Sequence, residues 1–534
     1  MGTTDPLARY EVCRCEIDGE AMWLDVSRMS FDDALWKKLA EPMTKAFDAM
    51  NALEAGAPAN VTEDRMVGHY WLRAPELAPN DAITQQIEDA VARAKQFAVA
   101  VHLGQIKPPC GDGFFVLLVI GIGGSALGAQ WLCDTLTETD APMIVRFIDN
   151  TDPSGIDRVI EEIGDSLELT MTLVVSKSGS TCETLNGMVE VARAYANAGL
   201  DFAEHAVAVT QDGSVLHERA TGEGWLATFP MWDWVGGRTS VLAMPGLLPV
   251  ALVGADVDEL LSGAHDADLV TRERAIRENP AATLAAMWYA AGGGRGDRQM
   301  VVLPYSDRLA LFSRYLQQLV MESLGKGTTR DGARTKQGLT VLGNKGSTDQ
   351  HALVQQLRDG RDDFFVTFVR VLADRGGVSP RVAADATSGD CLDAFWQGTR
   401  DALTENGRDS MTITMRNLDE RSIGALIALF ERAVGLYAEL IDVNAYDQPG
   451  VEAGKQAASA VIELQREVLA HLSQHKGKAL TAAEISQGVE RPDEAERIHH
   501  LLTHAAANPD HGVTASRDGQ GGRRFQIAPL PASG

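Results

Sequence analysis

The spacing of hydrophobic positions divides the chain into segments of different character. In the first hundred residues they recur at helical spacing, as in "FDDALWKKLAEPMTKAFDAMNAL" and "DAITQQIEDAVARAKQFAVAV", which is typical of amphipathic helices. After "KPPCGDG" they form short continuous runs, "FFVLLVI", "PMIVRFIDN", "MTLVVS" and "HAVAVT", separated by segments of helix length. This alternation predicts βαβ units around a parallel sheet that is buried on both faces.

A second series of apolar runs, "RQMVVLPYS", "GLTVLGN" and "FFVTFVRVLA", repeats this organisation. We therefore expect an α/β protein with two such domains, parallel sheets flanked by helices, and helical additions at both ends. Beyond Asn444 the pattern is helical again, until "GVTASRDGQGGRRFQIAP" predicts a hairpin. The expected parts are a mainly helical region 1–105, a first α/β domain 106–270, a second α/β domain 271–440, a helical arm 441–475 and a small extension 476–534.

Charge and composition narrow the class of protein. The 534 residues carry 74 acidic against 48 basic side chains, a formal net charge of −26, and such a surface repels the phosphate backbone of nucleic acids. No apolar run approaches the length of a membrane helix, and the first thirty residues do not resemble a signal peptide. The six cysteines show neither C-x-x-C pairing nor zinc-ligand spacing. We therefore expect a cytoplasmic protein without a metal site, nucleic-acid partner or membrane partner.

A glycine turn follows the first predicted buried strand, in "VLLVIGIGGSALGAQWL". Glycines allow the backbone to approach a ligand closely, and the N–H groups at the following helix start, near Gly124 and Ser125, can bind an anion. Read as G-x-G-x-x-A with Asp149 after the next strand, the turn also imitates a dinucleotide fingerprint. A nicotinamide-dependent dehydrogenase is therefore one alternative, and a turn that only makes room for packing is another.

The loop after "LVV" in "LVVSKSGSTCETL" is richer in donors than a turn requires. It carries four hydroxyl side chains and a lysine: Ser176, Lys177, Ser178, Ser180 and Thr181. Ser180 with Glu183 fits a capping box, which needs no ligand. A cap uses one hydroxyl, however, and hydroxyls, backbone N–H groups and the positive end of a helix together suit a phosphate monoester. The loop is not a nucleotide P-loop, because it lacks G-x-x-x-x-G-K-[ST].

Two charged residues are candidates for proton transfer chemistry. Glu322 falls on the apolar stripe of a predicted helix in "LFSRYLQQLVMESLGKG", and partial desolvation makes a carboxylate a stronger base. The alternative is a boundary glutamate near a helix end. Arg238 follows two glycines in "WDWVGGRTSVLAMPGLL"; it is either a structural ion-pair partner or a fixed charge for an oxyanion.

Two further segments carry a histidine and a lysine of possible function. In "GNKGSTDQHALVQQLRDG" His351 is predicted at the start of a helix, where imidazolium is disfavoured and a neutral ring can exchange a proton. A capping or packing histidine is the alternative. In "NAYDQPGVEAGKQAASAVIEL" Pro449 predicts a helix start, preceded by Gln448 and followed by Lys455. Most lysines at such positions are solvated.

Six of these segments together resemble the glucose-6-phosphate isomerase family. The blocks "GIGGSALG", "SKSGSTCET", "WDWVGGRTSVLAMPGL", "QQLVMESLGKG", "GSTDQHALVQQLRDG" and "YDQPGVEAGK" occur in the family's order and rough spacing, over about residues 110–465. The resemblance implies two sugar-isomerase (SIS) α/β domains with helical additions. It also implies reversible isomerisation of glucose 6-phosphate and fructose 6-phosphate through an enediolate, without cofactor or metal.

The resemblance also implies roles for single residues. The substrate-binding set comprises the phosphate loop (Ser176, Lys177, Ser178, Thr181), the glycine turn beside the sugar (Gly124, Ser125), and the amides of Gln318 and Gln448. Glu322 matches the base that shuttles a proton between C1 and C2, and Arg238 matches the residue that faces the enediolate. His351 and Lys455 match the pair that opens the sugar ring, and Glu183 resembles the partner that orients His351. In the family this histidine comes from the neighbouring subunit, so a homodimer is implied.

One part of the chain departs from the family, and one alternative class remains. After Lys455 the chain is longer than is usual, and its end is expected to form two helices and a hairpin, a shape resembling a small winged-helix unit. The helical part is acidic, which favours a packing or assembly role over DNA binding. The alternative class is a SIS-domain regulator that senses a sugar phosphate without turning it over.

Overall fold

The computed structural model describes residues 5–60, 64–343, 345–383, 385–519 and 521–527, and gives the backbone but not the side chains of residues 449–457. The chain divides into two units, residues 1–447 and 448–534. No helix among the described residues is both long and apolar enough to cross a membrane.

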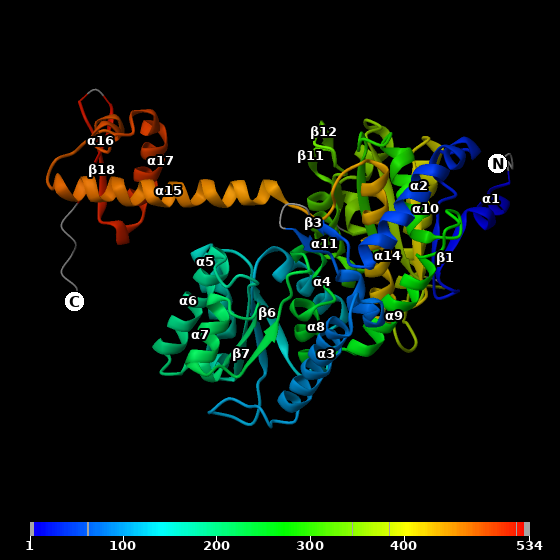
Figure 1. The fold of residues 1–534 in the computed structure, drawn as a ribbon, viewed down its shortest axis with the longest axis horizontal. Helices are drawn as coiled ribbons and strands as arrows, with labels where there is room; N and C mark the ends of the chain where they lie inside the picture. The colour runs from blue at the N-terminus through cyan, green and yellow to red at the C-terminus, as the bar shows by residue number, and fades with distance from the viewer. Residues whose placement is uncertain (1–4, 61–63, 344, 384, 520, 528–534) are drawn as a thin grey trace. The chain divides into compact units, whose positions relative to one another are not determined.

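The first α/β domain of the first unit is built on a five-stranded parallel sheet in the order β6-β5-β7-β8-β9 (Figure 1). Its strands are β5 (Val116–Ile120), β6 (Ile144–Ile148), β7 (Thr170–Val175), β8 (Ala206–Thr210) and β9 (Ala227–Pro230). The central strands are buried along their whole length. This is why they appear in the sequence as continuous apolar runs instead of alternating ones.

Helices cover both faces of this sheet. Leu118 and Val174 point to a face packed by α5 (Pro153–Ile163), α6 (Cys182–Asn197) and α7 (Val215–Glu223). Alternate side chains point to the opposite face, packed by these helices: α3 (Asp81–His102), α4 (Leu127–Leu136) and α8 (Met244–Leu252). The sheet is therefore the middle of three layers, and its strand ends are free to carry functional loops.

The second α/β domain of the first unit contains a six-stranded mixed sheet in the order β1-β2-β17-β14-β10-β13. The four strands at one side are parallel, and β2 and β1 extend the sheet antiparallel. Its strands are β1 (Arg14–Asp18), β2 (Met22–Asp25), β10 (Gln299–Tyr305), β13 (Val341–Gly343), β14 (Phe364–Val371) and β17 (Ser410–Met415). The predicted strands of both series are present, and the fold class is confirmed. The sequence pattern missed β1, β2, β9 and β17.

Helices again cover the second sheet, and short hairpins decorate the unit. One face packs on α12 (Val354–Asp359) and α13 (Ser388–Glu405), and the other on a group dominated by α14. The remaining helices are α1 (Pro6–Cys13), α2 (Asp33–Glu54), α9 (Val257–Val270), α10 (Pro280–Ala291), α11 (Phe312–Leu316) and α14 (Glu420–Leu440). The hairpin strands are β3 (Pro58–Asn60), β4 (Arg65–Met66), β11 (Lys326–Thr328), β12 (Arg334–Gln337), β15 (Arg381–Ala383) and β16 (Ala386–Thr387).

The second unit has its own small core. It consists of α15 (Pro449–Gln474), α16 (Ala482–Gly488), α17 (Ala495–Ala507) and the hairpin β18 (Val513–Arg517) and β19 (Arg523–Ile527). Val468 and Leu472 of α15 belong to one apolar cluster with Ile485 of α16, Leu502 of α17 and Phe525 of β19. The helices and the hairpin therefore share a single core. The two helices and the hairpin that the sequence predicts for this region are confirmed.

Candidate active site

The phosphate-binding candidate is the loop between β7 and α6. The helix begins at Cys182, so Thr181 is its N-cap residue, and the Thr181 side chain makes no capping hydrogen bond. The capping-box alternative for Ser180 and Glu183 is therefore wrong, because these residues are not at the N-cap and N3 positions that the motif requires. The hydroxyl groups of the loop do not serve the helix, and the N–H groups of the first turn have no partner within it.

The hydroxyl groups of this loop are bonded to one another. The buried Ser176 donates to the Thr181 hydroxyl oxygen at 3.2 Å and accepts from the Gly179 N–H at 3.2 Å. Ser178 accepts from the N–H of Ser180 at 3.2 Å and from its hydroxyl at 3.0 Å. Ser176 thus uses its proton inside the loop, whereas Ser178 and Thr181 act as acceptors there and keep their own O–H groups for an external acceptor.

Lys177 joins the phosphate-loop candidate to the segment that leads to Arg238. Its Nζ donates to the carbonyl of Asp233 at 3.0 Å and to that of Val235 at 3.2 Å. The 3₁₀ turn that carries Arg238, Gly237–Thr239, follows directly. The lysine thereby fixes the distance between the loop and the arginine, and holds a positive charge beside both.

The glycine turn after β5 packs closely against the turn that carries Arg238. A Cβ on Gly124 would lie only 2.0 Å from the Gly237 carbonyl oxygen, so only glycine allows this approach. Ser240 donates from its hydroxyl to the Gly124 carbonyl at 3.1 Å. The amide Nε2 of Gln318 lies 3.2 Å from the position of a Cβ on Gly123. The packing role considered for this glycine turn is therefore real, and the packing brings three of the predicted site segments together.

Glu322 and Arg238 form an ion pair at the centre of this group. The distance between Arg238 Nη1 and Glu322 Oε1 is 3.3 Å, and the two side chains are 5% and 21% exposed. Glu322 is the last residue of a π-helical turn, Gln317–Glu322, that continues α11. Within this turn Leu319 and Val320 are buried, whereas the Glu322 side chain is partly open; π-turns are frequent at functional sites.

Arg238 is held rigidly from several directions. Its Nε donates to the Ser323 hydroxyl at 2.9 Å, and its Nη2 donates to the carbonyls of Ala445 and, at 3.0 Å, Asp447. Burial lowers the pKa of Arg238 from its ordinary value, and the nearby carboxylates of Glu322 and Asp447 oppose this change. The guanidinium therefore presents a fixed charge beside the Glu322 carboxylate, at the place where an oxyanion would need it.

Sequence reasoning missed two charged residues at this site, Lys326 and Asp447. Lys326 Nζ donates to the Glu322 carbonyl at 3.0 Å and to the Asp447 carbonyl at 2.6 Å. It also forms an ion pair of 3.4 Å with the Asp447 carboxylate. Both residues stand inside quoted motifs, "ESLGKG" and "YDQPG", where a lone charge beside glycine or proline is indistinguishable from a solvated one.

His351 and Glu183 are both accessible in the single chain. His351 is exposed and ends a short 3₁₀ turn, Thr348–His351, three residues before α12. The expected position at a helix start is therefore wrong, because the 3₁₀ turn comes between the glycine-rich turn and the helix. Glu183 lies in the first turn of α6 and is partly exposed. Within the described residues neither side chain makes a hydrogen bond or ion pair.

The remaining two predicted residues, Gln448 and Lys455, belong to the second unit. α15 begins at Pro449 as predicted, with the exposed Gln448 as its N-cap residue. The side chain of Lys455 lies outside the described residues. The structure thus groups the segments of the phosphate loop, the glycine turn, Arg238, Gln318 and Glu322, all within the first unit.

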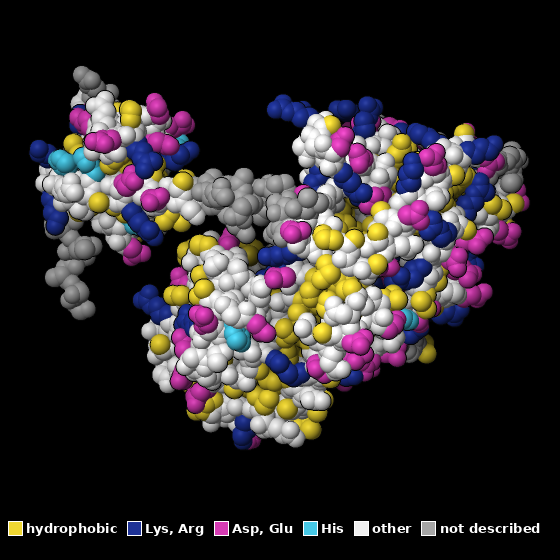
Figure 2. All heavy atoms as spheres, in the orientation of Figure 1, with side chains coloured by type: hydrophobic (Ala, Val, Ile, Leu, Met, Phe, Trp, Pro, Cys, Tyr) yellow, Lys and Arg dark blue, Asp and Glu magenta, His cyan; other side chains and the backbone are white. Residues whose placement is uncertain are grey.

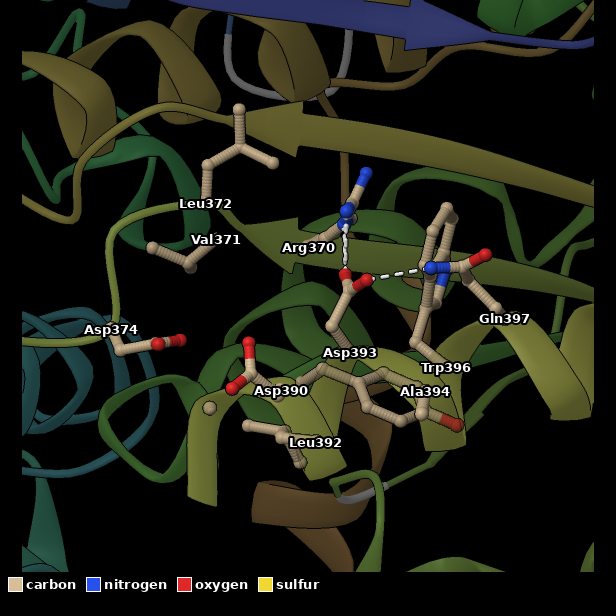
Figure 3. Close-up of a pocket in the computed structure, with 12 residues that line it drawn as sticks. Arg370, Val371, Leu372, Asp374, Asp390, Leu392, Asp393, Ala394, Trp396 and Gln397 are labelled. Atoms are coloured by element: carbon tan, nitrogen blue, oxygen red, sulfur yellow. Dashed lines mark hydrogen bonds and ion pairs between the residues drawn. The ribbon is translucent and has the colours of Figure 1, made fainter. Parts of the chain in front are cut away.

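A separate pocket of about 310 Å³ lies at the ends of β10 and β14 in the second sheet (Figure 3). Asp374, Asp390 and Asp393 line it, and Arg370 donates to Asp393 at 2.6 Å. Since its one arginine is already paired and the other charged side chains are carboxylates, this pocket repels a phosphate. Among the described residues, no cluster of His, Cys, Asp or Glu side chains is arranged to hold a metal ion.

Known proteins resemble this chain over most of its length. A family model described as Phosphoglucose isomerase matches residues 25–378 and 401–480. The glucose-6-phosphate isomerase of Citrifermentans bemidjiense is 56% identical over 493 residues, 92% of this chain and 93% of that protein. That of a Synechococcus species is 54% identical over 515 residues, 96% of each. The crystal structure of a glucose-6-phosphate isomerase from Chlamydia trachomatis matches with a TM-score of 0.77 at 26% identity, covering 86% of this chain and 91% of that one. The chain belongs to the phosphoglucose isomerase family.

Proposed function

We propose that Glu322 moves a proton between C1 and C2 of a bound sugar phosphate, while Arg238 stabilises the enediolate formed between the two transfers. The reaction follows from the family: the protein catalyses the reversible isomerisation of glucose 6-phosphate and fructose 6-phosphate, a step of glycolysis and gluconeogenesis. The observation that carries the proposal is the Arg238–Glu322 ion pair, which joins a partly enclosed carboxylate to a fixed positive charge.

The phosphate of the substrate binds the loop between β7 and α6. Ser178 and Thr181 donate their free O–H groups, and the positive end of α6 adds N–H groups and the helix dipole. Lys177 supplies the charge that overcomes the acidic net charge of the chain. Acidic and basic side chains are interspersed over the face of the first unit seen in Figure 2, so a dianionic substrate depends on this local site. The phosphate then provides remote binding energy that orients the reacting carbons.

The chemistry requires one base and one fixed charge on the same side of the sugar. Glu322 removes the proton from C2 of the open-chain aldose and returns it to C1. The C2 hydroxyl gives up its proton and becomes the carbonyl of the ketose, and the C1 oxygen takes up a proton and becomes a hydroxyl. During this transfer negative charge develops on the oxygens, and Arg238 stabilises it without having to reorient. Gln318 and the turn of Gly124 and Ser125 line the same region and hold the sugar hydroxyls. The family's ring-opening step is assigned to His351 and Lys455, with Glu183 orienting the histidine.

Two copies of the chain complete each site. In the single chain His351 is exposed, and its neighbour Gln350 donates at 3.0 Å to the carbonyl of Phe395, a residue that is 50% exposed. Leu372 and Val378 are also exposed in the same α/β domain. An exposed histidine in a domain that also exposes large apolar side chains is consistent with a subunit interface. We therefore assign a homodimer in which the partner subunit contributes its copy of His351 to each active site.

The parts of the chain divide these tasks. The first α/β domain, 106–270, binds the phosphate and holds Arg238; the second, 271–440, carries the base; the arm, 441–475, carries Gln448 and Lys455. A core joining α15 to α16, α17 and the hairpin supports a packing or assembly role for the extension, 476–534, and a winged-helix-like shape. The region 1–105 contributes helices and the strands β1 and β2, of which β1 forms one edge of the second sheet.

The Glu322→Gln variant tests the assignment of the base. The variant should bind fructose 6-phosphate normally but lose at least ~10³ in turnover, since a positioned acid–base group contributes about 10²–10⁴. The measurements are calorimetric binding, a coupled assay of glucose 6-phosphate formation, and exchange of the C1 proton with solvent followed by NMR. Near-normal turnover in the variant would remove Glu322 from this role. A parent protein that binds the sugar phosphate without exchange would instead be the sugar-phosphate-sensing regulator.

Mixed dimers test the shared histidine. Glu322→Gln and His351→Ala each inactivate a homodimer in the ring-closed substrate assay. Coexpressed, they form heterodimers in which one site has both its native glutamate and the native His351 of the partner subunit. Activity should therefore reappear on coexpression, which the coupled assay measures on tag-selected heterodimers. Heterodimers as inactive as the two parents would show that each site uses its own histidine.

A further inference from the structure

The buried Lys326 contacts the segment before Gln448 and the helix of the base at the same time. Its side chain is 7% exposed, and its Nζ bonds the carbonyls of Glu322 and Asp447 and pairs with the Asp447 carboxylate. It lies at the start of β11, paired with Gln337 of β12. A buried lysine is costly unless it is paired and bonded, so these contacts indicate a built position within the site.

Arg238 and Lys326 converge on the same stretch of chain. Both donate to the carbonyl of Asp447, at 3.0 Å from Arg238 and 2.6 Å from Lys326. The cluster contains two cations and two carboxylates, so its charges balance. Arg238 forms an ion pair with Glu322, and Lys326 forms an ion pair with Asp447. Arg238 lies between two carboxylates, because both Glu322 and Asp447 act on its charge. Arg238 therefore stays directed at Glu322 only while another cation neutralises the Asp447 carboxylate.

We propose that Lys326 is a positioning residue that neutralises Asp447, so that Arg238 stays directed at Glu322 and the reacting carbons. The inference rests on the proposed roles of Glu322 and Arg238, and adds a residue that acts through them without touching the substrate. Without Lys326, the Asp447 carboxylate competes for Arg238, which already donates to the backbone of that residue. A guanidinium that pairs with the Asp447 carboxylate stabilises the negative charge on the enediolate oxygens less.

The state of Lys326 agrees with this role. Burial lowers its pKa from the ordinary value, and the positive charge of Arg238 lowers it further, while Asp447 and Glu322 act in the opposite direction. The two cations thus repel each other at close range, and the arrangement persists because each has its own carboxylate. A lysine present only to close the fold would have no reason to lie against the catalytic arginine.

The test compares Lys326→Met with Asp447→Asn. Lys326→Met removes the ion pair and both carbonyl hydrogen bonds, whereas Asp447→Asn removes the ion pair alone. A clip that merely closes the structure therefore also loses more in Lys326→Met, but adding Asp447→Asn cannot restore it. Charge positioning predicts an asymmetry: Lys326→Met leaves an uncompensated carboxylate beside Arg238, whereas Asp447→Asn removes the competitor and keeps its carbonyl. We expect kcat to fall about 30-fold in Lys326→Met and by less than threefold in Asp447→Asn, with KM for fructose 6-phosphate within threefold in both, since the phosphate loop is untouched.

The double variant Lys326→Met/Asp447→Asn should regain at least fivefold in kcat over Lys326→Met, because the competing charge is gone. Lys336→Met, an exposed lysine on the paired strand β12, is the matched control and should match the parent. Equal losses in the two single variants, or no recovery in the double variant, overturn the proposal. If Lys326→Met does not fold, a tenfold loss in Asp447→Asn overturns it and parental activity supports it. Loss of turnover in Glu322→Gln with equal losses here would reject this inference and leave the proposed function standing.

Discussion

The two sheets of the first unit place loops of opposite character at the same topological position. In each sheet the first of the parallel strands lies between the second and the third: β5 between β6 and β7, and β10 between β13 and β14. Parallel sheets bind ligands at the carboxyl ends of strands near such a point. The loop from β7 to α6 therefore corresponds to the one from β14 to α13, and Figure 3 shows the pocket beside the latter.

Composition separates these two positions. The β7 loop carries hydroxyl groups with free protons and a lysine that lies 3.9 Å from one carboxylate, that of Asp233. The β14 position carries three carboxylates, Asp374, Asp390 and Asp393, around a single arginine paired with Asp393. The second sheet contributes differently, through the helix after β10 that ends in Glu322. Topology thus offers two equivalent places for an anion, and the side chains of the loops decide which one binds it.

Reversing the charge of each loop tests this conclusion with the largest expected effect. Lys177→Glu places a carboxylate in the phosphate loop and so makes it resemble the other edge. We expect kcat/KM to fall by about 10³, because a charge-assisted contact of about 1.5–3 kcal/mol is lost and a like charge faces the phosphate. The coupled assay measures the loss, and a thermal melt checks that the variant folds.

The control reverses the charge at the other edge. Asp374→Lys adds a cation to the pocket beside β14, where no phosphate is expected, so kcat/KM should stay within threefold of the parent. A loss below tenfold in Lys177→Glu, or a loss in Asp374→Lys as large as that in Lys177→Glu, would show that the two edges do not differ in the way their charges imply.

Two glycines sharpen the comparison at the level of backbone packing. Gly124→Ala would push a Cβ against the Gly237 carbonyl oxygen at 2.0 Å, and this obstacle is backbone. We expect kcat to fall about 100-fold, because the turn that carries Arg238 must move and small displacements of a catalytic group are costly. At the other edge a Cβ on Gly389 would meet the Asp374 carboxylate, the mobile end of an exposed side chain.

Gly389→Ala should therefore leave kcat within twofold, and alanine early in α13 removes a helix penalty of about 1 kcal/mol. Steady-state kinetics and thermal melts on both variants provide the comparison. A Gly124→Ala variant with parental kcat would mean that the Arg238 turn adapts, and that its close contact with the glycine turn is not needed for catalysis.

Much of this architecture could be predicted from the sequence, because buried strands and helix faces require apolar residues at regular local spacing. Strands such as β5, β7 and β14 are buried on both faces and read as apolar runs. β17, "SMTITM", is buried as well, but its alternating polar residues hide it. β2 pairs with β17 from the far end of the chain, with Asp25 opposite Thr412. Such a pairing has no local signal.

The site shows the same limit. Motifs located the segments of Glu322, Arg238 and the phosphate loop, because a motif consists of residue types at short spacing, which the sequence shows directly. They did not reveal that a π-turn carries Glu322, nor that Lys326 and Asp447 complete its charge balance, because both facts depend on contacts between distant segments. The glycine-rich segment before His351 predicts a helix start at this residue, but the residues between that segment and α12 form a 3₁₀ turn.

The smallest effects come from the two threonines that begin α6 and α13. Thr387 caps α13 in a capping box with Asp390, whereas Thr181, at the same position of α6, makes no cap bond. Thr181→Ala should raise KM for fructose 6-phosphate about tenfold, the effect of one hydrogen bond to a charged group. It also removes the acceptor of the buried Ser176 hydroxyl, so the free energy of unfolding should fall by about 1 kcal/mol. Thr387→Ala should lower that free energy by about 1 kcal/mol and leave KM unchanged. Kinetics and urea unfolding on both variants separate these outcomes. If Thr181→Ala left KM intact, the Thr181 hydroxyl would serve only the structure of its loop, and this contrast between the two threonines would fail.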